Sequence, residues 1–514
     1  METPRPLKEI LGEMTSKDAP DTALVTKAYE FSQNAHKDQK RYSGDPYFIH
    51  PAEVGYLLAN AGVDAQTIAA GLLHDTIEDA GVKPQNIEEL FGTDVLNLVE
   101  GATKLGALRY RGMERHTESL RKLFAATAQD IRVLIIKLMD RLHNARTLEF
   151  VPKEEKRVRI ALETLEIYAP IADRLGMSVA KTELEDAAFP FAYPKEFEKT
   201  KELLKERRQE NEKRLEKTEK DLKRALGEAG LRKFRTEARK KGDYSLFRKL
   251  ERKDWDIGKI YDIRALRVIF DSVADCYTAL GIVHAQWRPV PGKIKDYIAF
   301  PKPNGYQSIH TTVYTGDGGA LEIQLRTESM HREALYGIAS HLNYKEFQKS
   351  KYPEKSGGGG LEWIRQFIPR LGKSKAAIST NNSTTGGIPK WVKELAHAAP
   401  DSAKSQEYLD TLKTDFFSHR VFVFTPRGDV IDLPLAATPI DFAYAVHSDL
   451  GDHMSGARVN GKMVAIDTAL RNGDMVEIVT KPSAHPSRKW QDIAKTNLAK
   501  KHIRAAIAAL AQKK

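Results

Sequence analysis

Over residues 20–190 the chain repeats its apolar side chains at helical spacing. Val54, Leu57 and Leu58 lie three and four residues apart, and a second such series begins at Leu134. Apolar residues at these intervals share one face of a helix. Turn sequences such as residues 43–46 separate the segments. The pattern predicts an all-helical domain over residues 1–195.

The next segment, residues 196–230, consists mainly of Lys, Glu and Arg, with leucines at wide intervals. Mixed charge of this kind is typical of a long solvated helix. We therefore expect a connecting helix with a plain surface role.

Beyond residue 231 the pattern changes to short runs rich in β-branched residues. Runs at 263–270, 311–314 and 321–325 predict strands, and stretches near 273–282 and 331–344 predict helices. The mixture of the two predicts an α/β domain over residues 231–346.

The last third contains a linker and a small domain. Residues 347–415 include four consecutive glycines and a stretch rich in Ser, Thr and Asn, which predicts a linker with short helices. Short strands near 421–424 and 475–479 around a helix near 440–446 predict a small mixed β domain over 416–482. Residues 483–514 begin a basic helical region. The whole chain is thus predicted to be a multidomain α+β protein.

Composition narrows the setting. Among 514 residues there is one cysteine, Cys276, so an internal disulfide is impossible, which fits a reducing compartment. No run approaches the ~20 apolar residues that span a bilayer, and the first residues lack the apolar run of a secretory signal. We expect a soluble cytoplasmic protein with no membrane contact. The net charge of +11 favours anionic partners, although solvated surface helices explain such a charge equally well.

The helical domain carries imidazole and carboxylate groups in an ordered series: His50, His74, Asp75 and Asp140. Glu78 and Asp79 follow one helical turn after the central pair, so we expect the residues of 74–79 to share one helix surface. Such ligands suit a divalent ion such as Mn²⁺, Fe²⁺ or Zn²⁺. Such an ion activates and orients water for attack on phosphorus. The series predicts an HD-type phosphohydrolase site.

Each part of that series also has a purely structural interpretation. A lone His–Asp pair is often a surface or helix-capping feature, and residues 140–143 can be a surface ion pair plus a core leucine. The complete series on a helical background favours the metal site.

The α/β domain concentrates cations: Arg239, Lys241, Arg248, Lys249, Arg288, Lys293, Lys295 and Lys302. Asp262 and Glu322 are isolated acids at strand positions, and strand alternation puts Glu322 and Gln324 on one face. Acids on neighbouring strands can hold a Mg²⁺ ion that bridges nucleotide phosphates. Tyr306 on a turn can stack on a base. The alternative is a solvated cationic face with Tyr306 on the core; the acids favour a nucleotide site.

These motifs resemble those of the RelA/SpoT family of long alarmone synthetase/hydrolases. The resemblance runs from about residue 28 to the end and rests on segments 44–51, 73–79, 137–144, 296–311 and 322–327. Segment 420–480 is similar to the TGS domain of that family, a β-grasp module. The resemblance implies an HD hydrolase domain and a nucleotidyltransferase-like synthetase domain.

For the hydrolase, the resemblance implies cleavage of (p)ppGpp to GDP or GTP plus pyrophosphate. The implied Mn²⁺ ligands are His50, His74, Asp75 and Asp140. Glu78 and Asp79 are implied to position or activate the attacking water. The implied nucleotide contacts are Arg41, Ser43, Asn144 and Thr147.

For the synthetase, the resemblance implies transfer of the β,γ-pyrophosphate of ATP to the 3′-oxygen of GDP or GTP. Asp262 and Glu322 are implied to hold Mg²⁺, and Glu322 to help deprotonate the acceptor hydroxyl. The implied ATP-phosphate contacts are Arg239, Lys241, Ser245 and Lys249. Tyr306 is implied to stack on guanine, with further substrate contacts nearby: Lys295, Lys302, His310 and Gln324.

In the TGS domain, His447 is implied to contact the 3′ end of uncharged tRNA on the ribosome. The sequence ends at Lys514, so we expect the family's later helical, zinc-finger and ACT regions to be missing, through truncation or natural loss.

Four positions differ from the usual family pattern. The segment 293–296, Lys-Ile-Lys-Asp, keeps the charge of the Arg-x-Lys-Asp signature, which favours a bifunctional enzyme over a synthetase-only type. Ala238 stands where Gly is usual and Leu342 where Trp is usual, and both are expected to weaken synthesis or its regulation. Tyr42 replaces a common Lys beside the hydrolase site.

Two alternatives to a bifunctional enzyme stay open. One site can be a regulatory nucleotide-binding relic, although both domains carry complete sets of acids or cations. The chain can also be a ribosome- or tRNA-binding module without turnover, but binding alone requires neither set of acids.

Overall fold

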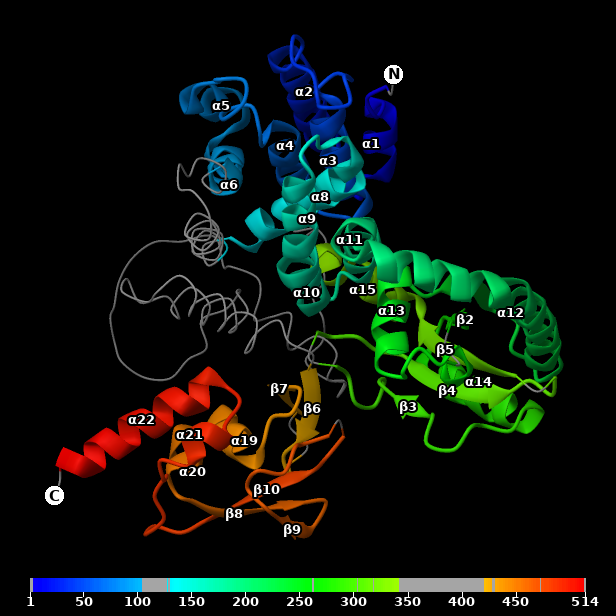
Figure 1. Cartoon of the computed structure of the whole chain (residues 1–514). Coiled ribbons are helices and arrows are strands. Elements are labelled where there is room, and N and C mark those ends of the chain that lie inside the picture. The colour runs from blue at the N-terminus through cyan, green and yellow to red at the C-terminus, as the bar shows by residue number, and fades with distance from the viewer. Residues whose placement is uncertain are drawn as a thin grey trace. The chain divides into compact units, whose positions relative to one another are not determined.

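The computed structural model describes residues 3–103, 127, 130–260, 263–302, 304–317, 319–341, 420–427, 430–471 and 473–512 (Figure 1). These residues fall into two compact units, one drawn from the chain up to residue 341 and the other from residue 420 onward. In the described part, no helix has the length and apolar character needed to cross a membrane.

The regular elements of the described residues up to 192 are all helices, which confirms the predicted fold class. They form α1 (Leu7–Glu13), α2 (Ala19–Ala35), α3 (Ile49–Asn60), α4 (Ala65–Leu73), α5 (Pro84–Phe91), α6 (Thr93–Thr103), α8 (Ile131–Arg146), α9 (Glu154–Glu163), α10 (Ala169–Arg174) and α11 (Ser178–Ala192), with a 3₁₀ turn at Leu148–Phe150 and a π turn at Thr164–Tyr168.

Three of these helices, α3, α4 and α8, pack against one another at the centre of the helical part. Helix α4 begins at Asp64, whose carboxylate accepts a hydrogen bond from the Thr67 backbone N–H. Gly71 permits the close approach of α3, because a Cβ at this position would lie 2.1 Å from Leu58 Cδ1. Gly71 therefore sets the spacing between α3, which carries His50, and α4, which His74 directly follows.

The helix predicted as a plain solvated connector is more than that. Helix α12 (Pro194–Glu228) buries Leu215, Leu222 and Leu226 in the core of the sheet that follows. These leucines lie seven and four residues apart, so they form one apolar stripe on an otherwise charged helix. The prediction of a plain surface helix was wrong, because the leucines, although widely spaced in the sequence, lie on one face of the helix.

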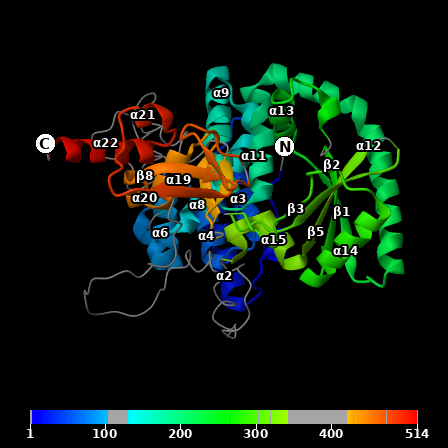
Figure 2. The same ribbon diagram turned by 90° about the horizontal axis from the view of Figure 1, so that it is seen from below.

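The described residues of 234–341 include a five-stranded sheet in the order β1-β2-β5-β4-β3. Its strands are β1 (Phe234–Lys240), β2 (Arg264–Phe270), β3 (Lys295–Asp296), β4 (Ile309–Tyr314) and β5 (Ala320–Thr327), and its helices are α13 (Asp243–Glu251), α14 (Val273–Gln286) and α15 (Glu328–Tyr336). Strands β2 and β5 are parallel and the other pairs antiparallel. Helices α12 and α14 cover the apolar face. Figure 2 shows this sheet beside α12 and α14.

The register of this sheet places polar residues on its other face. Gln324 of β5 lies opposite Arg267 of β2 and His310 of β4. Because side chains alternate along a strand, Glu322 and Arg326 share the face of Gln324. The face opposite α14 is therefore lined by cations and acids.

The second unit is a small mixed β fold. It contains β6 (Arg420–Phe424), β7 (Val430–Pro434), α19 (Pro439–Val446), α20 (Ser448–Asp452), β8 (Met454–Val459), β9 (Lys462–Val464), β10 (Val476–Thr480), α21 (Trp490–Ile493) and α22 (Asn497–Gln512). Buried Asp441 caps α19 with Thr438 and accepts hydrogen bonds from the backbone N–H groups of Lys495 and Thr496. This carboxylate fastens the last helical segment to the β fold.

Candidate active sites

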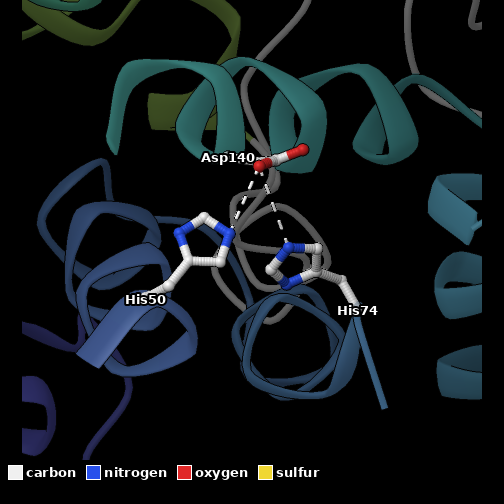
Figure 3. A group of neighbouring side chains, drawn as sticks. All are labelled: His50, His74 and Asp140. Atoms are coloured by element: carbon white, nitrogen blue, oxygen red, sulfur yellow. Dashed lines mark ion pairs between the residues drawn. The ribbon is translucent and has the colours of Figure 1, made fainter. Parts of the chain in front are cut away.

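Two histidines and an aspartate converge between the three central helices. His50 lies in the first turn of α3, His74 directly follows α4, and Asp140 lies within α8; all three are buried (Figure 3). Their potential ligand atoms lie within 4.8 Å of one another. Asp140 Oδ1 is 3.3 Å from His50 Nε2 and 3.9 Å from His74 Nε2. This spacing suits a shared divalent ion.

Asp75 joins the same cluster. Its Oδ1 lies 3.2 Å from His74 Nε2, and its Oδ2 lies 3.5 Å from His50 Nε2. The four residues of the predicted metal site are thus neighbours in space, although they come from three separate parts of the chain.

Hydrogen bonds fix which nitrogen of each imidazole faces this cluster. His74 Nδ1 lies 2.8 Å from the Gly71 carbonyl oxygen, so it carries the hydrogen and donates it. Its Nε2 is buried, has no hydrogen-bond partner within the part of the chain that the structure describes, and points to the carboxylates. An orphaned buried nitrogen of this kind is destabilising unless it binds something. A metal ion fits that requirement, and the carbonyl partner is the usual support for a ligating imidazole.

His143, to which the sequence assigned no role, orients His50. Its Nδ1 lies 3.0 Å from an Nη1 of Arg41, which can only donate, so His143 Nδ1 is an acceptor. His50 Nδ1, 2.8 Å from the same atom, therefore carries the hydrogen. The Nε2 lone pair of His50 is left to face Asp140 and Asp75. Burial lowers the pKa of His143 to about 2, with His50 and Arg41 adding to the effect, so it stays neutral.

Lys137 keeps the carboxylates of this site ionised. Its Nζ lies 2.6 Å from Asp140 Oδ2. Burial alone would raise the pKa of Asp140, but the Lys137 ammonium and the two imidazoles hold it well below its ordinary value. Asp75 likewise has a lowered pKa despite its burial, because His74 and His50 face it. Burial lowers the pKa of His50. These are the protonation states that bind a metal.

The predicted nucleotide contacts of the hydrolase lie beside this cluster. Arg41 donates hydrogen bonds to Asn144 Oδ1 at 3.1 Å and to Thr147 Oγ1 at 3.2 Å. Asn144 in turn donates to Asp140. Ser43 accepts a hydrogen bond from the Asp45 backbone within its own turn, so its nucleotide role stays a prediction.

The expectation that residues 74–79 lie on one helix was wrong. Helix α4 ends at Leu73, and residues 74–79 form turns. Thr76 explains the ending, because both its hydroxyl and its backbone N–H bond to the Leu73 carbonyl. Glu78 and Asp79 are both exposed.

Tyr47 is a site residue that sequence reasoning missed. Its hydroxyl donates to Asp75 Oδ2 at 2.8 Å and to Asp79 Oδ2 at 2.6 Å. Burial, together with the two carboxylates, raises the pKa of Tyr47, so the hydroxyl stays protonated. Its place in segment 44–51, three residues before His50, was the available signal.

A second site lies on the polar face of the sheet, in a cavity of about 200 Å³. Predicted synthetase residues line it: Arg239, Lys241, Ser245, Lys302, Tyr306 and His310. The Tyr306 hydroxyl lies 2.7 Å from His310 Nε2, and Lys302 Nζ lies 5.1 Å from the centroid of the Tyr306 ring. Burial lowers the pKa of Lys302 and, with Lys302 and Arg239, that of His310.

The predicted magnesium pair is described only in part. Asp262 lies outside the described residues. Glu322 Oε1 accepts a hydrogen bond from Gln324 Nε2 at 2.6 Å and lies 3.5 Å from His310 Nδ1. Lys249, Lys295, Glu322 and Gln324 are not among the described residues that line the cavity. Their substrate roles stay predictions.

One wall of this cavity comes from the helical domain, which the sequence did not indicate. Asp173 and Lys181, at 3.2 Å from each other, line it. Ser245 donates a hydrogen bond to Glu185 Oε2 at 3.0 Å, and the Tyr244 backbone N–H donates to Asp186 Oδ1 at 3.1 Å. Acids of α11 therefore hold the start of α13, where ATP phosphates were predicted to bind.

His447, the predicted RNA contact, is exposed at the start of α20. Its Nδ1 accepts a hydrogen bond from the Asp449 backbone at 3.2 Å. Its RNA-binding role stays a prediction.

Comparison with known proteins gives three domain matches. Residues 28–178 match the HD domain, residues 238–349 match the region found in RelA / SpoT proteins, and residues 421–480 match the TGS domain. These matches confirm the three predicted fold types.

Full-length relatives extend across nearly all of the chain. It is 43% identical over 492 residues to a GTP pyrophosphokinase of Myxococcus xanthus, covering 95% of this chain and 61% of the relative. It is 43% identical to a probable guanosine-3′,5′-bis(diphosphate) 3′-pyrophosphohydrolase of Synechocystis (94% and 60% covered), and 42% identical to a guanosine-3′,5′-bis(diphosphate) 3′-pyrophosphohydrolase of Aquifex aeolicus (97% and 66% covered). The chain thus spans about three fifths to two thirds of the length of these relatives.

Proposed function

Because this chain belongs to the RelA/SpoT family, we propose that it is a bifunctional alarmone enzyme. Its helical domain would act as a guanosine-3′,5′-bis(diphosphate) 3′-diphosphatase, and its sheet domain as a GTP pyrophosphokinase. The observation that carries the hydrolase half is the buried cluster of His50, His74 and Asp140, with the buried Nε2 of His74 facing Asp75.

The residues of the helical domain divide the work of hydrolysis. His50, His74, Asp75 and Asp140 would hold Mn²⁺. When bound, such an ion lowers the pKa of its water and orients it for attack on phosphorus. Arg41, between Asn144 and Thr147, would bind the nucleotide. Glu78 and Asp79, both exposed, would receive the proton of the attacking water.

The sheet domain would bind both nucleotides on its cationic face. Arg239, Lys241, Ser245 and Lys249 would hold the phosphates of ATP, because guanidinium and ammonium groups match phosphate oxygens. Tyr306 would stack on guanine, with Lys302 and His310 beside it. Glu322 with Asp262 would hold Mg²⁺, and Glu322 would draw the proton from the acceptor 3′-hydroxyl.

The second unit would connect the enzyme to translation. Its match to the TGS domain supports binding to the ribosome and to uncharged tRNA, with His447 at the tRNA 3′ end. The lone cysteine, Cys276, is buried, which is compatible with work in the cytoplasm.

Two incubations test the proposed function. Protein mixed with Mn²⁺ and ppGpp is expected to release pyrophosphate. Protein mixed with Mg²⁺, ATP and GDP or GTP is expected to form ppGpp or pppGpp and AMP. Absence of pyrophosphate release in the first mixture would remove the hydrolase assignment, and absence of product in the second would remove the synthetase assignment. Binding of tRNA without turnover in either mixture would favour a binding module.

A further inference from the structure

Arg326 is a buried guanidinium that neither proposed reaction uses. It lies on β5, four residues beyond Glu322 on the same face of the sheet, and its side chain is only 1% exposed. It lines the synthetase cavity. One Nη donates to His331 Nδ1 at 2.9 Å, whereas Nε is buried and has no hydrogen-bond partner among the described residues.

Within the described part of the chain, no ion pair found includes Arg326; the carboxylate that acts on it, Glu237, already pairs with Arg235 and Arg267. Burial lowers the pKa of Arg326 only to about 10, so the group is still a cation at neutral pH. Leaving a buried charge unpaired is strongly destabilising. The same cavity is lined by three further cations, Arg239, Arg267 and Lys302, and by two acids, Asp173 and Glu333. The four cations together would attract an anion into the cavity.

We propose that Arg326 is a further phosphate ligand for the nucleotides of the synthesis reaction, and that His331 is the residue that positions it. The inference rests on the proposed synthetase function. A guanidinium binds phosphate oxygens through two parallel N–H groups, which suits the polyphosphate of ATP or of the GDP or GTP acceptor. The geometry assigns the shared chemistry, and kinetics with each nucleotide distinguish the two sources.

His331, on α15, is built to hold the guanidinium. Its side chain is buried, at 5% exposed. Because a guanidinium only donates, His331 Nδ1 must be the acceptor and the ring hydrogen lies on Nε2. That nitrogen faces Glu237 Oε1 at 3.5 Å, and Glu237 Oε2 accepts a hydrogen bond from Arg267 at 2.9 Å. Glu237 therefore orients the ring, and the ring orients Arg326.

The position in the sheet explains why the cation reaches the substrate. In the register of β5 with β2, Arg326 lies opposite Ile269, one alternation beyond the pair of Gln324 with Arg267. Arg326 and Arg267 thus stand on one face, on neighbouring parallel strands. Two guanidiniums on adjacent strands form a surface that a chain of phosphates can span.

Steady-state kinetics of synthesis test the proposal. KM is measured for ATP at saturating acceptor and for the acceptor at saturating ATP. Loss of one charge-assisted contact is expected to raise one KM by about ten- to hundredfold in Arg326→Gln. A raised KM for ATP assigns the donor phosphates to Arg326, and a raised KM for the acceptor assigns the acceptor phosphates. Unchanged KM values for both nucleotides would overturn the proposal.

Substitutions of His331 separate positioning from folding. Asn offers an acceptor oxygen near the place of Nδ1, so His331→Asn is expected to keep KM within about threefold of the wild type. His331→Leu lacks the acceptor and is expected to raise the same KM that Arg326→Gln raises. If Asn and Leu have equal effects, His331 does not position Arg326.

Two controls keep the outcomes distinct. Arg332→Gln removes an exposed neighbouring cation and is expected to leave both KM values unchanged. Hydrolysis of ppGpp by each variant reports whether the protein is folded. If Arg326→Gln loses hydrolysis, the KM values of Arg326→Lys and His331→Leu test the proposal instead. If the wild type makes no alarmone, the proposed function fails instead. Calorimetric binding of ATP and of GDP to the wild type and Arg326→Gln then tests the ligand role, and equal affinities would overturn it.

Discussion

Tyr47→Phe removes one hydroxyl from the hydrolase site and almost nothing else. The ring stacks on His36 at 4.9 Å between centroids, and Phe preserves that contact. The hydroxyl is the link between Asp75, at 2.8 Å, and Asp79, at 2.6 Å. Without it, the two carboxylates lose the hydroxyl group that both contact. We expect both to leave the positions that catalysis needs.

The size of the effect follows from one shared hydrogen. A hydrogen bond to a charged group is worth about 1.5–3 kcal/mol. The hydroxyl has a single hydrogen for both contacts, so the total stays within that range. Each 1.36 kcal/mol is a factor of ten in rate. We therefore expect kcat/KM for ppGpp hydrolysis to fall by about 10- to 150-fold.

The assay is pyrophosphate release from ppGpp in Mn²⁺, with synthesis from ATP and GDP measured on the same preparation. Synthesis is expected to be unchanged. Tyr56→Phe is the matched control, because it removes a hydroxyl in the same helical domain while the ring remains under the Arg5 guanidinium at 4.3 Å. Hydrolysis by Tyr47→Phe within about twofold of the wild type would refute the reasoning. An equal loss in Tyr56→Phe would show that general destabilisation is responsible.

Three further outcomes follow from particular contacts. Burial raises the pKa of Asp186 from 3.8 to about 6, so the native state binds its proton more tightly and the free energy of unfolding declines as pH rises toward and through 6. In denaturant titrations, Asp186→Asn is therefore expected to add at most about 1–3 kcal/mol to the free energy of unfolding at pH 8 and nothing at pH 4. An equal change at both pH values would contradict this. Gly337→Ala is expected to lower Tm, because φ at Gly337 is +54° and a Cβ there would lie 2.0 Å from the Leu175 carbonyl oxygen. The control Gly281→Ala, which places a Cβ in open space on a helix, is expected to raise the free energy of unfolding by about 0.5–1 kcal/mol. Equal Tm changes in the two variants would disprove the clash. Excess Mn²⁺ is expected to raise the Tm of the wild type but not that of His74→Ala, because binding at a hundredfold excess over Kd adds about 2.7 kcal/mol to the free energy of unfolding. An equal rise of Tm in both proteins would place the ion elsewhere.

Much of the helical site could be predicted because its chemistry lies in short segments. His50, His74, Asp75 and Asp140 stand in an ordered series, and the structure brings them together. What supports them could not be predicted in the same way. The role of His143 depends on Arg41 reaching across from a loop 102 residues earlier in the chain, which only the tertiary fold provides.

The sheet site shows a different limit. Strand alternation indicated that Glu322 and Gln324 share a face, and the same rule extended by two residues reaches Arg326. The role of Arg326 could not be predicted because the residue is buried, whereas an isolated arginine in a sequence is normally a surface residue. The wall formed by Lys181 and Asp173 had no sequence signal, because it depends on packing between helices α10 and α11 and the sheet domain.

The central claim is that two separate catalytic sites lie in one chain, and crossed variants test it most directly. Asp75→Ala and Glu322→Ala are each assayed for ppGpp hydrolysis in Mn²⁺ and for synthesis in Mg²⁺. We predict that Asp75→Ala abolishes hydrolysis and keeps synthesis, and that Glu322→Ala does the reverse. Loss of both activities in either folded variant, or survival of hydrolysis in Asp75→Ala, would contradict the account.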